Sequence, residues 1–573
     1  MRTSCCYAFC LVVLLPVVLA SVNFDTCLLE VRNGTWGTVG GTDNEGNPVS
    51  NISEATAITY ELCLTACGAD PEPFDWNIFS QQFSAWLLPY LAMVSQLPFG
   101  ANNRLDNLVS MLLTMGSPTL AAYSLALTVL NGAWVARRFS HLNYPNTRNA
   151  VKILSSLQQS SFRVVADDAL LASLIVLPEN DEWWSELVLW LNYVHTWSIS
   201  AVASIIWVLV AYVFTVVDSF TGVVTYSTLN ANGQAVGSIF LWLLPIVIGW
   251  LQISPKCDHE RVHQALARAN AIAHVATPEG KPVLASNISN RRAISLEKGG
   301  GDIHYDEQPS APIYNYARFI PWTLAVEEVY CGFREASEKS DSRQPVNLRA
   351  EWTKGDRNTR VHPENRRGSD AQVAAYVEPV ADPEIRHHFP LRRRRWGPGV
   401  VSRFIVAAGF ALSLTWGSVG AAILVAFFTP TKGLACRSGS YLIYGVMSTL
   451  IWMLLVASSV LAHFLRRYMH TKSTRLAGIL AIILRRTAKV LAALNTAWIV
   501  LACLFQFASF FDRCWCNSSV FYLGKRAYNV IDVTSHDVAA LNAPWLGGVA
   551  LACGCAVLFL VFVNVLINPP LPD

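Results

Sequence analysis

Residues 545–567 read WLGGVALACGCAVLFLVFVNVLI and contain no Asp, Glu, Lys or Arg. A helix needs about 20 mostly apolar residues to cross the hydrocarbon core of a bilayer, so this stretch predicts a membrane-spanning helix. Other stretches of the chain are apolar over a similar length. The predicted spans are 108–135, 197–217, 236–253, 402–428, 440–463, 489–511 and 545–567. The sequence therefore predicts an all-α membrane protein with about seven transmembrane helices.

The composition of the chain agrees with this fold class. Of its 573 residues, 53% are hydrophobic and 14% are charged, whereas a typical soluble domain has about 25% charged residues. The net charge of +3 gives no indication of a nucleic-acid partner. About half of the Lys, Arg, Asp and Glu residues lie between 256 and 395, so the rest of the chain is poor in charge.

The N-terminus has the pattern of a secretory signal. Residues 1–20 combine a basic start, an apolar core and small residues at the end, which predicts a signal peptide. Residues 21–78 then hold nine acidic residues against a single Arg, with sequons at Asn33 and Asn51. We expect 21–78 to be a small lumenal or extracellular segment that carries glycans.

The charges of the loops indicate the orientation of the spans. The loops at 136–196, 254–400 and 464–488 are rich in Lys and Arg, whereas 218–235 and 429–439 carry zero and two basic residues. The positive-inside rule places the first three in the cytosol. Seven crossings from a lumenal N-terminus satisfy every loop and leave the C-terminus in the cytosol.

An eighth apolar stretch complicates this count. Residues 79–98 are apolar but are broken by Pro89 and Pro98. Eight crossings would place either the N-terminal segment or the basic loops on the side of the membrane that the positive-inside rule disfavours. One part of 79–116 is therefore expected to be re-entrant or interfacial. Either the Pro-broken stretch fails to span, or Gly116-Ser117-Pro118 splits the next span into a short hairpin. Non-helical backbone is stable within the bilayer only where other parts of the protein shield it from lipid.

These features divide the chain into five regions. The 254–400 loop opens with a helix-like run, and within it 337–372 are polar and are expected to be disordered. Residues 314–333 predict a helix that either docks on the bundle or forms a small core of its own. The regions are the signal peptide (1–20), the lumenal segment (21–78), a first membrane region with a cytosolic loop at 136–196 (79–253), the long cytosolic loop (254–400) and a second membrane region with four spans and a short cytosolic tail (401–573).

Cysteines of the predicted lumenal side come in two groups of three. The groups are Cys27, Cys63 and Cys67, and Cys436, Cys514 and Cys516, the last two beside a sequon at Asn517. An oxidising compartment favours disulfides. If all six cysteines are oxidised, the odd number in each group requires at least one bond between the groups. We expect Cys27 to pair with Cys63 or Cys67, and the remaining one to reach the bundle. A further sequon at Asn287 lies in the cytosolic loop and should stay unused.

Three stretches of the chain are similar to a known group of proteins. They are Leu177–Trp184 (LPENDEWW), Tyr314–Arg318 (YNYAR) and Gly433–Gly439 (GLACRSG). They resemble a group of uncharacterised multi-pass integral membrane proteins of filamentous fungi. The resemblance covers most of the chain from about residue 79 onward and implies a membrane location and a fungal source. It implies no activity.

One motif of the chain indicates possible metal chemistry. His259-Glu260-Arg261-Val262-His263 matches HExxH, in which two His of one helix face bind zinc and the Glu activates a water. The charged Arg261 and the lack of a recognisable motif around a third ligand favour a coincidental match. The third-ligand candidates are His274, Glu327 and Glu328. The sequence contains no P-loop, nucleophile elbow or dinucleotide fingerprint, so no cofactor is indicated.

Two further patterns indicate contact with the membrane surface. Arg392, Arg393, Arg394 and Arg395 precede a span directly. They are candidates for contact with anionic lipid headgroups, or serve only to orient the span. The Trp residues at 183, 184, 190 and 197 suggest an interfacial aromatic belt.

The sequence as a whole favours a function without catalysis. The central parts of the predicted spans lack ionisable residues, which argues against an ion-coupled transporter. We expect a receptor or scaffold of the plasma membrane, or of a secretory-pathway or vacuolar membrane. It would act through its cytosolic loop on a cytosolic protein partner. The alternative is a passive transporter or channel, and the second alternative is a membrane zinc metalloprotease that uses His259, Glu260 and His263.

Overall fold

The computed structural model describes most of the chain and is mainly helical. The described residues are 22–99, 104–193, 197–221, 227–296, 301–355, 361–378, 396–467 and 472–572. The predicted signal peptide and Arg392–Arg395 lie outside them. Within the described residues, seven helices are long and apolar enough to cross a membrane, and each overlaps one predicted span. They cover Pro118–Phe139, Ile199–Val217, Gly233–Ile253, Val400–Phe428, Cys436–Leu465, Arg475–Phe507 and Ser535–Ile567.

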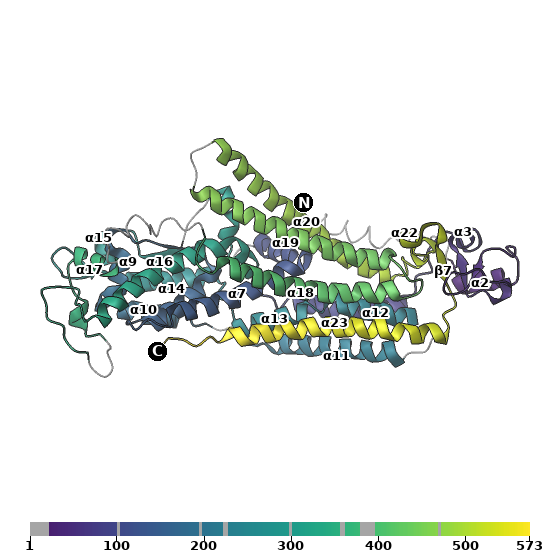
Figure 1. The fold of residues 1–573 in the computed structure, drawn as a ribbon, viewed down its shortest axis with the longest axis horizontal. Coiled ribbons are helices and arrows are strands. Elements are labelled where there is room, and N and C mark those ends of the chain that lie inside the picture. Colours follow the sequence, from purple (N-terminus) through teal and green to yellow (C-terminus); the bar gives the residue numbers. More distant parts are fainter. Residues whose placement is uncertain are drawn as a thin grey trace, which may run out of the picture.

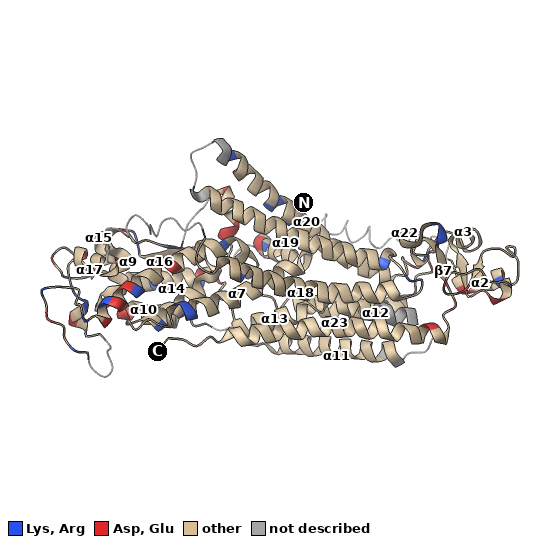
Figure 2. Ribbon diagram, viewed as in Figure 1, with Lys and Arg blue, Asp and Glu red and all other residues tan. Residues whose placement is uncertain are grey.

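The molecule is elongated and has three parts in a row (Figure 1). At one end lies the cap, which we define as residues 22–75 and 508–534. The helical bundle follows, and at the other end lies the loop body, defined as the described residues of 140–193 and 254–378. Figure 2 shows that Lys, Arg, Asp and Glu gather in the cap and the loop body, while the middle of the bundle is nearly free of them. This distribution fits a bilayer around the bundle, with the loop body at the end predicted to face the cytosol.

The cap joins the N-terminal segment to the loop before the last helix. A three-stranded sheet in the order β1-β2-β7 connects them, with Ala57 of β2 paired to Val530 of β7 in antiparallel register. The N-terminal segment is therefore not an independent unit. The elements of the cap are α2 (Phe24–Arg32), β1 (Gly41–Thr42), β2 (Ala57–Thr59), α3 (Tyr60–Leu62), the π-turn η2 (Cys63–Cys67), α21 (Cys514–Asn517), α22 (Val520–Leu523) and β7 (Tyr528–Val530).

The bundle surrounds α7 (Pro118–Phe139), a helix that is buried over 89% of its most apolar stretch. The peripheral α23 (Ser535–Ile567) is buried over only 22% of the corresponding stretch. An outer helix with that exposure suits contact with lipid. The other helices are α4 (Trp76–Gln82), the π-turn η3 (Phe83–Leu87), α5 (Leu88–Val94), α6 (Arg104–Gly116), α11 (Ile199–Thr221), α12 (Ser227–Phe240), α13 (Leu243–Ile253), α18 (Val400–Phe428), α19 (Cys436–Arg467) and α20 (Lys472–Phe507).

The loop body is built from both long loops of the predicted cytosolic side. Strand β3 (Phe162–Val164) of the first loop pairs with β6 (Ile294–Leu296) of the second in antiparallel register. One hydrophobic core contains side chains from both loops. The remaining elements are α8 (Thr147–Ser156), α9 (Leu170–Val176), α10 (Asp181–Leu191), α14 (His259–Ala271), β4 (His274–Val275), β5 (Val283–Leu284), α15 (Ala285–Ile288), η8 (Asp302–Glu307), η9 (Pro312–Tyr314), α16 (Asn315–Asp341), η10 (Pro363–Arg366) and α17 (Asp370–Val377).

Two expectations for this region are wrong. Residues 337–372, expected to be disordered, contain the end of α16 and the start of α17, and Val346 and Val361 are buried in the core. The composition of this stretch is mostly polar and therefore suggests disorder, although its few apolar residues pack against the other loop. Trp183 and Trp184 are fully buried inside the loop body rather than at a membrane surface.

Candidate functional site

Helices α6 and α7 form a hairpin whose two ends both reach the loop body. At the start of α6, Asp106 accepts a hydrogen bond from the Tyr305 hydroxyl at 3.4 Å. Near the end of α7, Arg138 forms an ion pair with Glu327 at 2.5 Å. Because Tyr305 and Glu327 both belong to the loop body, the hairpin enters and leaves the bundle at the same end.

The apex of this hairpin lies midway along its neighbours. Ser117 Oγ donates a hydrogen bond at 2.7 Å to the carbonyl of Ser448, which lies well inside α19. The Asn495 amide of α20 donates to the Gly116 carbonyl at 2.8 Å. A Cβ built on Gly116 would lie 2.1 Å from the Ala492 carbonyl oxygen, so the two helices touch backbone to backbone. The apex is thus covered by protein, as re-entrant backbone requires.

The preceding helical segment, Trp76–Val94, runs the length of the bundle. Its start adjoins the cap, where the Glu72 amide bonds to the Asp512 carbonyl at 2.9 Å. Beyond its end, Leu97 lines a small cavity together with Pro312 of the loop body. This geometry favours the alternative in which Gly116-Ser117-Pro118 makes a hairpin and the Pro-broken segment crosses. The count of seven crossings is unchanged, although α7 by length and composition could also span.

Helix α16 connects the bundle to the loop body, and the sequence left both of its roles open. Tyr316, Phe319 and Ile320 belong to the hydrophobic core of the bundle. About two turns further along the helix, Val326 and Val329 belong to the core of the loop body. The helix therefore has both roles at once, docking on the bundle and contributing to the core of the loop body.

Arg403 of α18 stabilises the junction between the bundle and α16. Its side chain, 4% exposed, donates to Asn131 of α7 at 2.6 Å and to Thr323 of α16 at 3.1 Å. The guanidinium also lies 4.0 Å from the ring centroid of Trp134, a favourable cation–π geometry. One buried cation thus joins α7, α16 and α18. In the sequence Arg403 looks only like a charge beside a span, so its role was missed.

A second polar cluster ties α20 to the loop body. Asp306 of η8 is buried and accepts from Lys489 Nζ at 2.6 Å, and the Tyr316 hydroxyl donates to the same carboxylate. Arg485, one turn before Lys489, lies 3.8 Å from Asp306 and donates to the Ile303 carbonyl at 3.0 Å. Buried carboxylates need such partners. The cluster holds the middle of α20 against η8.

Arg318, also on α16, is buried, and its hydrogen-bond acceptors among the described residues are neutral. It donates to Asn315 at 2.9 Å, to Gln159 at 3.2 Å and to the Pro309 and Ala311 carbonyls. Its burial lowers the pKa of the guanidinium to about 10. The stretch Tyr314–Arg318, one of the three that carry the fungal resemblance, is buried throughout.

The six predicted cysteines lie in three pairs at disulfide distance. The pairs are Cys27–Cys67, Cys63–Cys514 and Cys436–Cys516. Cys63–Cys514 joins residues 451 positions apart and links the N-terminal segment to the loop before α23, within the cap. This is the arrangement that the parity of the two cysteine groups favours.

The predicted sequons differ in their surroundings. Asn33 and Asn51 are exposed on the cap. Asn517 is half-buried, and its side-chain oxygen accepts from Arg437 at 3.2 Å. Asn287 is exposed in the loop body. Use of these sites for glycans remains a prediction.

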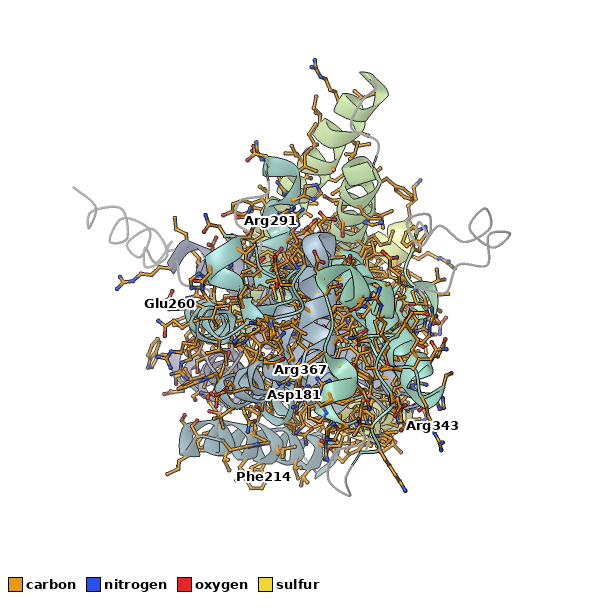
Figure 3. All side chains as sticks on the ribbon, turned by 90° about the vertical axis from the view of Figure 1, so that its left-hand side faces the viewer. Asp181, Phe214, Glu260, Arg291, Arg343 and Arg367 are labelled. Carbon is orange, nitrogen blue, oxygen red and sulfur yellow. A yellow bond between two sulfur atoms is a disulfide. The ribbon has the colours of Figure 1, made fainter. Side chains whose placement is uncertain are left out.

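The two His of the HExxH match lie near each other at the start of α14, with ring centroids 6.4 Å apart. Among the described residues, no further His, Cys, Asp or Glu completes a group of three ligands with them. Glu260 is exposed and lies at the periphery of the loop body, as Figure 3 shows. His274, a proposed third ligand, lies in β4 against Asn180.

Comparison with family models, with curated proteins and with solved structures found no match.

Proposed function

We propose that the protein is a non-enzymatic membrane receptor or scaffold that acts through its loop body. The observation that carries this proposal is the position of α16, whose first two turns belong to the core of the bundle and whose following turns belong to the core of the loop body. A displacement of the bundle helices around α16 would be passed to the loop body through rigid packing rather than through a flexible linker.

The polar contacts of the junction support the same proposal. Arg403 and the cluster around Asp306 join α7, α18 and α20 to α16 and η8. The cap is joined to the bundle by Cys436–Cys516, which links α21 to the start of α19, and by the ion pair between Arg437 and Asp512. Rigid contacts therefore connect the cap, the bundle and the loop body in series. This arrangement suits a protein that transmits a signal across a membrane or anchors a partner there.

Site-specific photo-crosslinking of the full-length protein in cells tests this proposal. The photoreactive residue replaces Leu348 or Ile288, apolar side chains of the loop body that are 79% and 57% exposed. The control is Val39 of the cap, 84% exposed. We expect a cytosolic protein to be captured from Leu348 or Ile288 and not from Val39. Absence of any cytosolic adduct at both loop-body positions would contradict the proposal.

A passive transporter or channel is the second candidate, favoured by the α6–α7 hairpin. Re-entrant segments that meet near the bilayer centre occur in channels and transporters, where they line the solute site. Solute efflux from liposomes that contain the purified protein tests this candidate. Efflux above that of protein-free liposomes, changed by Ser117→Val at the apex, would favour it over the receptor.

A further inference from the structure

A cavity of about 610 Å³ lies where the bundle meets the loop body. Its walls come from α7, α8 and α10 and from the last residues of α13 and α23. Ile253 and Ile567 end α13 and α23, and both line the cavity. Because both helices are candidate spans, the cavity lies at the depth of lipid headgroups, on the side predicted to face the cytosol.

The charged side chains of this cavity are all positive. Lys152 of α8 and Lys256, three residues after α13, line it, and none of its lining residues is Asp or Glu. Lys256 Nζ donates to the Tyr193 carbonyl and lies 4.9 Å from the centroid of the Tyr193 ring. Within the described part of the chain, neither ammonium forms an ion pair. Both therefore have donors left for an anion.

The rest of the lining is divided between polar and apolar side chains. Ser156, Asn192 and Gln252 offer neutral donors near the two lysines, whereas Leu191 and Leu566 offer apolar surface. A site of this kind suits a ligand that is anionic at one end and apolar at the other. The volume falls in the range of about 300–1,000 Å³ that is usual for small-ligand sites.

We propose that this cavity binds a phosphate-bearing anionic amphiphile, and specifically the headgroup of an anionic phospholipid from the adjoining leaflet. Lys152 and Lys256 bind the phosphate, and the apolar residues at the ends of α13 and α23 contact the start of the acyl chains. The residues that line the cavity lie elsewhere in the sequence than Arg392–Arg395, and the proposal is independent of the proposed receptor function.

Two kinds of variant test the site in the full-length protein. Lys152→Gln removes one charge from an exposed side chain that forms no ion pair with the described residues, and Lys281→Gln is its control at an exposed position outside the cavity. Gly132→Leu fills the cavity, because Gly132 lines it and a Cβ there meets nothing within 4 Å. Gly409→Leu is its control, since Gly409 is equally open but lies elsewhere, in α18.

The measurement is native mass spectrometry of the detergent-purified protein titrated with phosphatidylserine or with phosphatidylcholine. We expect tighter binding of phosphatidylserine, weakened about five-fold by Lys152→Gln, because one basic residue near anionic lipid contributes about 1 kcal/mol. Gly132→Leu should weaken it as well, without any change of charge, and the two controls should not. Equal binding of both lipids, or wild-type binding by both cavity variants, would overturn the proposal.

A competition experiment separates the lipid from a soluble anion. Inorganic phosphate shares the proposed chemistry but lacks acyl chains, so it should displace phosphatidylserine only weakly. If millimolar phosphate removes the bound lipid completely, the site serves a soluble phosphate compound and the assignment to lipid is wrong.

Discussion

Replacement of Gly116 by Ala tests the apex of the α6–α7 hairpin. The added Cβ would lie 2.1 Å from the carbonyl oxygen of Ala492 and 2.8 Å from its Cα. Both atoms are backbone atoms of α20 and cannot rotate away. The two helices would have to separate by roughly 1 Å, and overpacking of this kind destabilises by about 1–3 kcal/mol.

The same separation would stretch the hydrogen bond from Asn495 to the Gly116 carbonyl, now 2.8 Å long. Loss of one such bond costs about another 1 kcal/mol. Gly132→Ala in α7 is the matched control, since its Cβ would meet nothing within 4 Å. In a helix interior that exchange is favourable by about 0.5–1 kcal/mol. We therefore expect the two variants to differ by about 3–5 kcal/mol in the free energy of unfolding.

The assay is unfolding of the purified protein in mixed micelles by added SDS, followed by the fluorescence of its 19 tryptophans. Gly116→Ala should unfold at a lower SDS fraction than the wild type, and Gly132→Ala at the same or a higher one. If Gly116→Ala is as stable as the wild type, α6 and α20 do not meet at this glycine and the apex has been placed wrongly.

Three further predictions concern the cap and the loop body. Peptide mapping without reductant should recover a cross-linked peptide pair that contains Cys63 and Cys514, and its absence would show that the N-terminal segment is not bonded to the loop before α23. Burial and the nearby acidic side chains of the cap raise the pKa of Glu72 to about 7. The folded cap then binds more protons than the unfolded chain between the ordinary pKa of 4.5 and about 7, so its stability should fall as the pH rises through that window. Hydrogen exchange of the cap at pH 5 and pH 8 measures this, and Glu72→Gln should abolish the difference. Replacement of both His259 and His263 by Ala should leave the zinc content of the purified protein unchanged. Loss of one zinc ion per protein molecule would instead support the metalloprotease hypothesis.

The positions of the candidate spans could be predicted because apolar length is a local property of the sequence. Each of the seven overlaps a predicted stretch. The hairpin could be predicted only as one of two alternatives, since Gly116-Ser117-Pro118 marks a break without showing which neighbours cover it. That choice depends on partners such as Ser448 and Asn495, more than 300 residues away.

The loop body was harder to predict because its two halves are far apart in the chain. Residues 337–372 look disordered in isolation, yet Arg366 is buried there and pairs with Asp181 of the other loop at 2.6 Å. Arg403 similarly needs α7 and α16 before its hydrogen bonds exist. Long-range polar partners of this kind leave no local signal in composition or periodicity.

The topology of the hairpin is the central claim, and cysteine labelling in sealed vesicles tests it most directly. The vesicles expose their cytosolic face to a membrane-impermeant maleimide, with the wild-type chain as background. Leu105→Cys probes the exposed start of α6, His141→Cys follows the end of α7, and Val39→Cys reports the cap. We expect Leu105→Cys and His141→Cys to be labelled and Val39→Cys to be protected. Protection of Leu105→Cys together with labelling of His141→Cys would mean that residues 104–139 cross the membrane, and would contradict the account.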